Sequence, residues 1–204
     1  MRIIKVATDD GVAFYRILSR LKATHLRFSV PSSLKQVDLT GDLVVTSRQE
    51  LASFVKGVAI EDLSDDPLTF EAQLLSRLLE GSKSDLLIGV DPGSRIGVAV
   101  FFGGREVGAI TSNSVEKSVE YVAALVRAVP HSSVSVKIGG GEPESSSRLE
   151  RLMRRKLPIE ASVEIVDESG TSAEVRGVIG ATRDQRAAAR IAFRKRPSPR
   201  SSRL

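Results

Sequence analysis

The chain has 204 residues, 41% of them hydrophobic and 27% charged, which is enough for one ordinary domain or two small ones with a real core. It contains no cysteine, which excludes disulfides, thiolate zinc sites and cysteine nucleophiles, and it has no apolar run that suits a membrane span or a secretory signal, so we expect a cytoplasmic protein with no membrane partner. The formal net charge of +5 lies entirely in residues 85–204, which carry 19 Arg and Lys against 14 Asp and Glu, and this excess suggests an anionic partner such as nucleic acid.

Residues 1–65 are expected to form a small α/β domain. Apolar runs predict strands within 2–8, 25–30, 42–46 and 58–60. A helix is predicted by apolar residues at helical spacing, namely Phe14, Ile17, Leu18 and Leu21. Ser47 followed by Glu50 has the spacing of a capping box and predicts a further helix over 48–57.

Two acids, Asp9 and Asp10, follow the first of these strands. They resemble the acidic pocket of a response-regulator receiver, but Thr46 stands where that family would have its phosphoacceptor aspartate. We therefore expect Asp9 or Asp10 to cap the helix that follows.

The polar stretch EDLSDDPLTF marks a domain boundary, and an apolar stripe from Phe70 to Leu79 predicts a linker helix at 66–84. Residues 85–195 are expected to form a second domain, and residues 196–204 a basic disordered tail. Within 85–195 the expected order is three strands, helix, strand, helix, strand and then two helices. This order begins with a β-hairpin and continues with alternating helices and strands, which predicts an α/β layer fold.

Acidic residues occur in the second domain where strands end or where a helix faces the sheet. Asp91 interrupts the most apolar stretch of the chain, where a charged carboxylate is costly unless it is paired. The others are Glu142 after a glycine-rich turn, Asp167 and Glu168 after a strand, and Asp184 on the small-residue side of a helix. Each could be a turn or capping residue, but together they suit Mg²⁺ or Mn²⁺, which prefer carboxylate oxygens.

Four segments of this domain follow one another in a recognisable order: IGVDPGSRIGVAV, VKIGGGEPESSSRLERL, VDESGTS and RDQRAAARIA. In this order they resemble the first strand, fourth strand, fifth strand and closing helix of the RuvC/YqgF-type nucleases of the RNase H-like superfamily. The resemblance covers about residues 85–195. It implies an RNase H-like mixed sheet, metal-ligand roles for Asp91, Glu142 and Asp184, and a catalytic role for Asp167 or Glu168.

Two positions depart from the pattern of that superfamily. Ser169 stands where YqgF-type proteins usually have arginine. Gln185 follows Asp184, whereas RuvC-type resolvases tend to have two acids on the final helix. Both departures bear on whether the site is active.

Basic side chains flank the acids. They are Arg148, Arg151 and Arg155 on the helix after Glu142, and Arg183, Arg186, Arg190 and Arg194 on the last helix. They could hold phosphates through contacts that are independent of base sequence. A solvated helix face and a frayed tail are the alternative interpretation.

These patterns lead to the hypothesis of a metal-dependent endonuclease that acts on structured DNA or RNA, such as a Holliday-junction resolvase or an RNA-processing nuclease. A metal-activated water would attack the phosphodiester, with Asp91 as the central ligand. A resolvase would need two active sites and hence a homodimer. The alternatives are a non-catalytic nucleic-acid-binding or scaffold protein on the same fold, and an actin-like ATPase, which would need two such domains where the chain has room for one.

Overall fold

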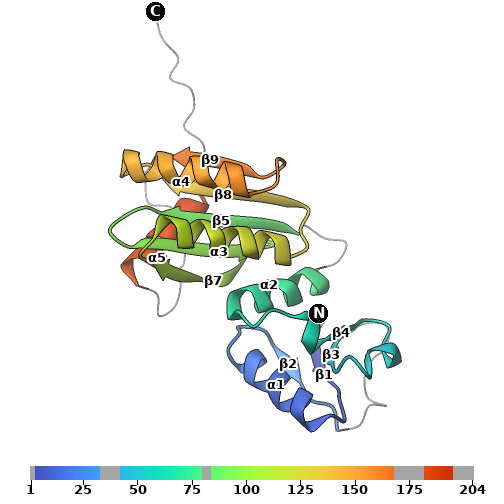
Figure 1. Ribbon diagram of the computed structural model, residues 1–204. Coiled ribbons are helices and arrows are strands. Elements are labelled where there is room, and N and C mark those ends of the chain that lie inside the picture. Colours follow the sequence, from blue (N-terminus) through green and yellow to red (C-terminus); the bar gives the residue numbers. More distant parts are fainter. Residues whose placement is uncertain (1–2, 33–41, 80–83, 168–181, 195–204) are drawn as a thin grey trace, which may run out of the picture. The chain divides into compact units, whose positions relative to one another are not determined.

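The structure is a computed structural model in which residues 3–32, 42–79, 84–167 and 182–194 are described. The chain divides into two compact units, Met1–Ser82 and Lys83–Leu204, and each has its own sheet (Figure 1). The expected tail at 196–204 and the first of the two helices expected after the last strand lie outside the described residues. None of the helices in the described part is both long enough and apolar enough to pass through a membrane.

The first unit is built on a parallel sheet whose described strands have the order β2-β1-β3-β4. These strands are β1 (Ile4–Val6), β2 (Phe28–Ser29), β3 (Leu43–Thr46) and β4 (Gly57–Ala59). Two helices, α1 (Gly11–Lys22) and α2 (Pro67–Leu78), share one apolar core with this sheet. The N-terminal unit is therefore an α/β unit, as the sequence predicts.

A side chain fixes the start of α1. The carboxylate of Asp10 accepts hydrogen bonds from the backbone N–H groups of Val12 (2.8 Å) and Ala13 (3.1 Å). These N–H groups have no carbonyl partner within the helix, so the carboxylate replaces one. The expectation that Asp9 or Asp10 caps this helix is confirmed for Asp10.

The helix α2 belongs to the first unit. Asp66 caps it by accepting a hydrogen bond from the backbone N–H of Thr69 (2.9 Å), and Phe70 and Leu74 are buried in the same core as Ile4. The sequence predicts this segment as a linker helix, because an apolar stripe does not reveal which neighbours it packs against. Here the stripe completes the core of the strands and helix that precede it.

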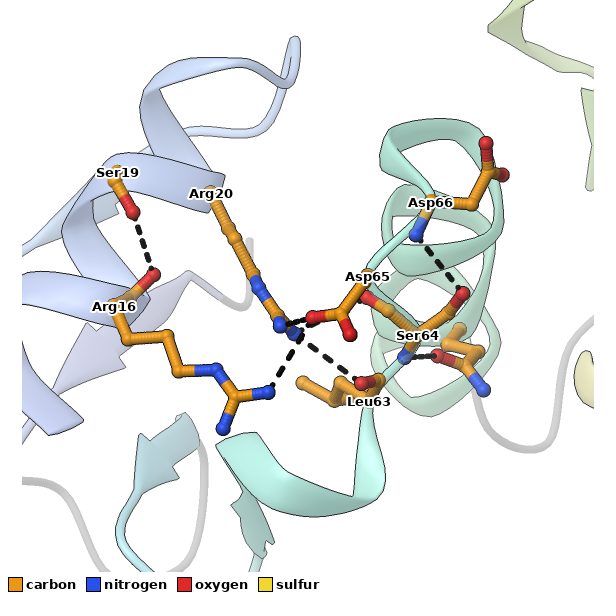
Figure 2. Close-up of polar contacts among 8 residues, drawn as sticks. Arg16, Ser19, Arg20, Leu63, Ser64, Asp65 and Asp66 are labelled. Atoms are coloured by element: carbon orange, nitrogen blue, oxygen red, sulfur yellow. Dashed lines mark hydrogen bonds and ion pairs between the residues drawn. The ribbon is translucent and has the colours of Figure 1, made fainter.

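Arg16 and Arg20 of α1 reach the segment that leads into α2 (Figure 2). Both guanidinium groups contact the carboxylate of Asp65, that of Arg16 at 3.3 Å. Arg20 also donates hydrogen bonds to the carbonyls of Leu63 and Ser64, each at 3.2 Å. Burial, and then the nearby charge of Arg16, lower the pKa of Arg20 from its usual value. Arg20 thus supplies partners to two backbone carbonyls and ties α1 to α2.

The segment after β3 differs from the helix that the spacing of Ser47 and Glu50 predicts. A short 3₁₀ helix, Leu51–Ser53, forms there, and no side chain caps it. The hydroxyl of Ser47 donates to the Glu50 carboxylate at 2.6 Å instead of accepting from a helix N–H group. The predicted helix over 48–57 is therefore wrong, because Glu50 has partners elsewhere in the unit.

Glu50 joins the ends of two neighbouring strands. Its carboxylate accepts hydrogen bonds from the hydroxyls of Ser47 (2.6 Å), Thr46 (3.2 Å) and Thr8 and from the backbone N–H of Asp9 (2.7 Å). Thr46 ends β3, whereas Thr8 and Asp9 follow β1. Burial raises the pKa of Glu50, but these hydrogen bonds outweigh burial and lower that pKa to about 2.

The second unit is built on a mixed sheet whose described strands have the order β7-β6-β5-β8-β9. An antiparallel meander comprises β5 (Asp85–Asp91), β6 (Ile96–Phe102) and β7 (Arg105–Ser112), and the parallel strands β8 (Ser133–Gly139) and β9 (Ser162–Val166) follow on the other side of β5. Figure 1 shows α3 (Val115–Ala128) and α4 (Pro143–Lys156) on one face of this sheet and α5 (Arg183–Ala192) on the other. The predicted mixed sheet with flanking helices is confirmed.

Replacing Glu50 with glutamine should lower the free energy of unfolding at neutral pH by about 1–3 kcal/mol, because buried hydroxyls lose a charged acceptor. The pKa of Glu50 is about 2 in the folded chain and ordinarily 4.5, so its contribution is complete above pH 4.5 and is lost as the pH falls toward 2. We therefore expect urea unfolding to depend less steeply on pH in E50Q than in the wild type between those values. The control is E160Q, at an exposed position in the second unit, and an equal slope in E50Q and the wild type would contradict the prediction.

Candidate functional site

Asp91 is the last residue of β5 and lies directly opposite Gly97 of β6. Opposed residues of an antiparallel pair point to the same face, with Cα atoms about 4.5–5.5 Å apart. Gly89 precedes Asp91 by two residues and therefore shares that face. What lies over the two glycines consequently identifies the surroundings of Asp91.

The helix α5 lies with its backbone against both glycines. A Cβ atom at Gly97 would be 2.2 Å from the carbonyl oxygen of Asp184, and a Cβ atom at Gly89 would be 2.0 Å from that of Ala188. No side chain fits at either position, so both require glycine. The glycine at 97 lets another backbone come close, and that backbone is the start of α5.

Asp91 and Asp184 are therefore brought together around Gly97. Asp91 lies beside Gly97 in the sheet with its side chain on the α5 face, and the backbone of Asp184 covers Gly97 on the same face. Both acids are half-buried. The sequence predicts the two as members of one site, and the packing of α5 places them at the same edge of the sheet.

Gln185 anchors the start of α5. Thr182 and Gln185 form a capping box, in which the Gln185 side-chain oxygen accepts from the backbone N–H of Thr182 (2.8 Å). The amide nitrogen of Gln185 donates to the carbonyl of Ala109 on β7 (3.1 Å). The resemblance described above leads us to expect a second acid directly after Asp184. Gln185 stands there instead, and it holds the segment that carries Asp184.

The other end of α5 is tied to β8 and to the end of β9. Lys137 of β8 donates from its Nζ to the carbonyl of Arg194. The guanidinium of Arg194 in turn donates to the backbone carbonyl of Asp167 (3.0 Å). Arg194, predicted as a phosphate contact, therefore has a structural role at this position.

Glu142 and Asp167 follow the two strands beyond β5. Because β8 and β9 run parallel to β5, their carboxyl ends reach the same edge of the sheet as Asp91. Glu142 is exposed at the start of α4, where its carboxylate accepts from the Ser145 hydroxyl at 3.3 Å. Asp167 is exposed directly after β9.

Within residues 3–32, 42–79, 84–167 and 182–194, no three His, Asp or Glu side chains lie close enough to share a metal ion. Glu168 and Ser169 are outside those residues. The structure thus places the backbone of Asp184 next to the end of the strand that carries Asp91, and the strands that precede Glu142 and Asp167 end at the same sheet edge.

Thr111 is a residue of this site that the sequence does not reveal. It lies opposite Gly97 on β7 and so faces α5, and its hydroxyl oxygen is buried with no hydrogen-bond partner in the described structure. Thr111, Gly97 and Asp91 form one row across the sheet, about 10 Å long at the usual strand spacing. Threonine is ordinary in strands, so no local pattern points to it.

The predicted basic residues fall on opposite faces of the sheet. On α4, Arg148 pairs with Glu116 of α3, whereas Arg151 and Arg155 are exposed. On α5, the exposed basic residues are Arg183, Arg186 and Arg190. Asp91 and Asp184 share the α5 face, so the two sets of arginines are not equivalent.

Two half-buried acidic residues and a buried hydroxyl on one face of the sheet carry the oxygen ligands that hard divalent cations prefer. The exposed arginines of α5 offer charge to an anion next to them. The sequence matches no protein-family model and no characterised protein with which it was compared.

Replacing Gly97 with alanine should displace the start of α5 and lower the free energy of unfolding by about 1–3 kcal/mol, because the new methyl group would overlap the Asp184 carbonyl. Hydrogen–deuterium exchange of the α5 amides should rise in G97A. The matched control is G11A at the first residue of α1, where an added Cβ atom meets nothing within 4 Å. Unchanged exchange in α5 of G97A would contradict the packing described above.

Proposed function

We propose that this chain is a Mg²⁺- or Mn²⁺-dependent nuclease that hydrolyses phosphodiester bonds in structured nucleic acid. The observation that carries the proposal is that the backbone of Asp184 lies over Gly97, the residue opposite Asp91. These acids come from the first strand and from the last helix of one domain, and each is unusual in its local sequence. The proposed substrates are branched DNA, as for a Holliday-junction resolvase, or structured RNA.

The topology of the second unit supports the proposal. An antiparallel meander followed by two strands parallel to its first strand is the mixed sheet that a resemblance to RuvC/YqgF-type nucleases implies. In such sheets, ligands gather at the carboxyl ends of the parallel strands. Asp91, Glu142 and Asp167 all follow or end such strands.

The chemistry of the site fits a divalent cation. Asp91 and Asp184 would hold it through carboxylate oxygens. Glu142 follows a strand that ends at the same sheet edge, but it would have to move closer to supply a third ligand. A bound cation supplies charge neutralisation at the phosphate and lowers the pKa of a coordinated water. The buried hydroxyl of Thr111 is a further polar group on this face whose hydrogen-bonding capacity is unused in the described structure.

The chain's own residues would do the rest of the work. The close contact of the α5 backbone with Gly97 would fix the start of α5, and with it the backbone of Asp184, relative to the strand that carries Asp91. The exposed arginines of α5 would neutralise neighbouring phosphates.

A second candidate function is non-catalytic binding of nucleic acid on the same fold. The observation that favours it is the role of Gln185, whose amide is engaged with Thr182 and Ala109 where RuvC-type resolvases tend to have an acid. Binding that persists in EDTA, with no cleavage of branched DNA or structured RNA, would select this function. We place either function in the cytoplasm, and a resolvase would act as a homodimer.

Replacing Asp91 with asparagine should reduce Mg²⁺- or Mn²⁺-dependent cleavage by about 100-fold or more, because the amide lacks the charge that holds the cation. Cleavage would be measured on labelled four-way DNA junctions and on structured RNA. If Asp91 also orients the reacting groups, raising the Mg²⁺ concentration should not restore the cleavage rate of D91N.

The matched control is D85N, at the opposite end of the same strand, where the Asp85 carboxylate accepts from the hydroxyl of Ser133 (2.6 Å). This variant should keep wild-type cleavage. Full activity in D91N, or equal losses in both variants, would refute the proposed role of Asp91.

A further inference from the structure

The two sets of basic residues differ in what surrounds them. On α4, the cations Arg148, Arg154 and Lys156 pair with acids. The acids are Glu116 and Glu120 on α3 and Glu150 on α4 itself, with the Lys156–Glu120 pair at 2.7 Å and the Arg154–Glu150 pair at 2.9 Å. Most of the positive charge of α4 is therefore balanced by carboxylates at its own surface.

The lowered pKa values of Glu116 and Glu120 agree with these contacts. For Glu116 the largest cause is a hydrogen bond from its own backbone N–H, followed by the Ser114 hydroxyl and, after a small opposing effect of burial, by Arg148. For Glu120 the largest cause is the hydrogen bond from Lys156. Both acids are therefore ionised at neutral pH and partly cancel the charge of α4.

On α5, the outer side carries cations without such partners. Arg183, Arg186 and Arg190 recur at i, i+3 and i+7, so they follow one side of the helix, and all three are exposed. None of the three forms an ion pair with any residue in the described part of the chain. The opposite side of α5 carries Ala188 and Ala192, which pack on the sheet. The helix is thus fixed by its small residues and presents outward a positive stripe that no acid of the described residues pairs with.

The helices α4 and α5 also differ in where their arginines lie relative to Asp91 and Asp184. Asp184 lies in the first turn of α5, next to Arg183. The stripe therefore begins beside the two acids Asp91 and Asp184, called the acidic pair below. From Arg183 to Arg190 it extends about 10 Å along the helix, the axial length of about three nucleotides. A phosphate held on the outer side of α4 would instead be separated from Asp91 by the sheet and by a helix about 10 Å thick.

From this arrangement we infer that nucleic acid lies along the outer side of α5, with Arg183, Arg186 and Arg190 as its phosphate contacts. The exposed arginines of α4 do not hold it. The inference rests on the proposed function for the identity of the partner, and it adds the face of the domain and the direction in which the strand leaves the acidic pair. Because the contacts are to phosphates, binding is salt-dependent and tolerant of base sequence.

The test compares two double variants in a D91N background: R186A/R190A on α5 and R151A/R155A on α4. Each removes two exposed arginines, so the net charge changes equally. Fluorescence anisotropy of labelled 30-nucleotide single-stranded, duplex and four-way-junction DNA, and of a structured RNA, would be read in EDTA at several salt concentrations. Thermal unfolding of both variants would confirm that they fold.

We expect R186A/R190A to weaken binding at least tenfold at low salt and to reduce the slope of log K against log salt by about 2, since each lost phosphate contact removes about 0.9. The R151A/R155A variant should bind within twofold of its parent. Equal losses in the two variants, or a larger loss in R151A/R155A, would overturn the inference. Tighter binding of labelled poly-glutamate than of any nucleic acid would overturn it as well.

The inference and the nuclease proposal can fail separately. If R186A/R190A loses affinity as expected while the wild-type chain cleaves no substrate, the nuclease fails and the inference holds, because binding is read without metal. If the wild-type chain cleaves and R186A/R190A keeps its affinity, the inference alone fails.

Discussion

The second unit depends on two positions in its sheet, Gly89 and Gly97, where a helix backbone takes the place of a side chain. With carbonyl oxygens of α5 where Cβ atoms would otherwise stand, the helix is held closer to the sheet than side-chain packing allows. This contact determines where Asp184 lies, and it also determines which side of α5 faces outward. The acidic pair and the arginine stripe are both consequences of the same steric constraint.

In the first unit an apolar core is supplemented by polar side chains that link elements distant in the sequence. Its strands are short, and the ends of β1 and β3 are joined by the carboxylate of Glu50. Arg20 provides a similar link between α1 and the approach to α2. In each case one charged group serves several backbone or hydroxyl partners, which makes such contacts stronger than isolated surface ion pairs.

The sequence predicts those features whose partners are close along the chain. Asp10 caps the helix that begins at the next residue, and the order of the apolar runs predicts an α/β layer fold. The capping box at Ser47 fails for the opposite reason, since Glu50 also binds Thr8 and Asp9, which lie about 40 residues away. A spacing rule cannot include partners that only the fold brings near.

The same limit applies to the candidate site. Asp91 and Asp184 could be selected from the sequence because each is out of place in its own segment. The sequence alone could not distinguish the arginines of α4 from those of α5. Helical spacing identifies the exposed side of a helix, but it does not tell which face of the sheet the helix covers or which acids lie on the neighbouring helix. The ion pair between Glu116 and Arg148 can therefore be seen only in the folded structure.

Gln185 has a consequence for how this domain could change over evolutionary time. Its amide accepts from Thr182 at one atom and donates to Ala109 at the other, a combination that an ionised glutamate cannot provide. A mutation to glutamate would add a carboxylate next to Asp184 while loosening the segment on which Asp184 is mounted. A glutamate would still accept from the Thr182 N–H, but it would set a negative carboxylate against the carbonyl of Ala109, so a second acid beside Asp184 would weaken the attachment of α5 to β7.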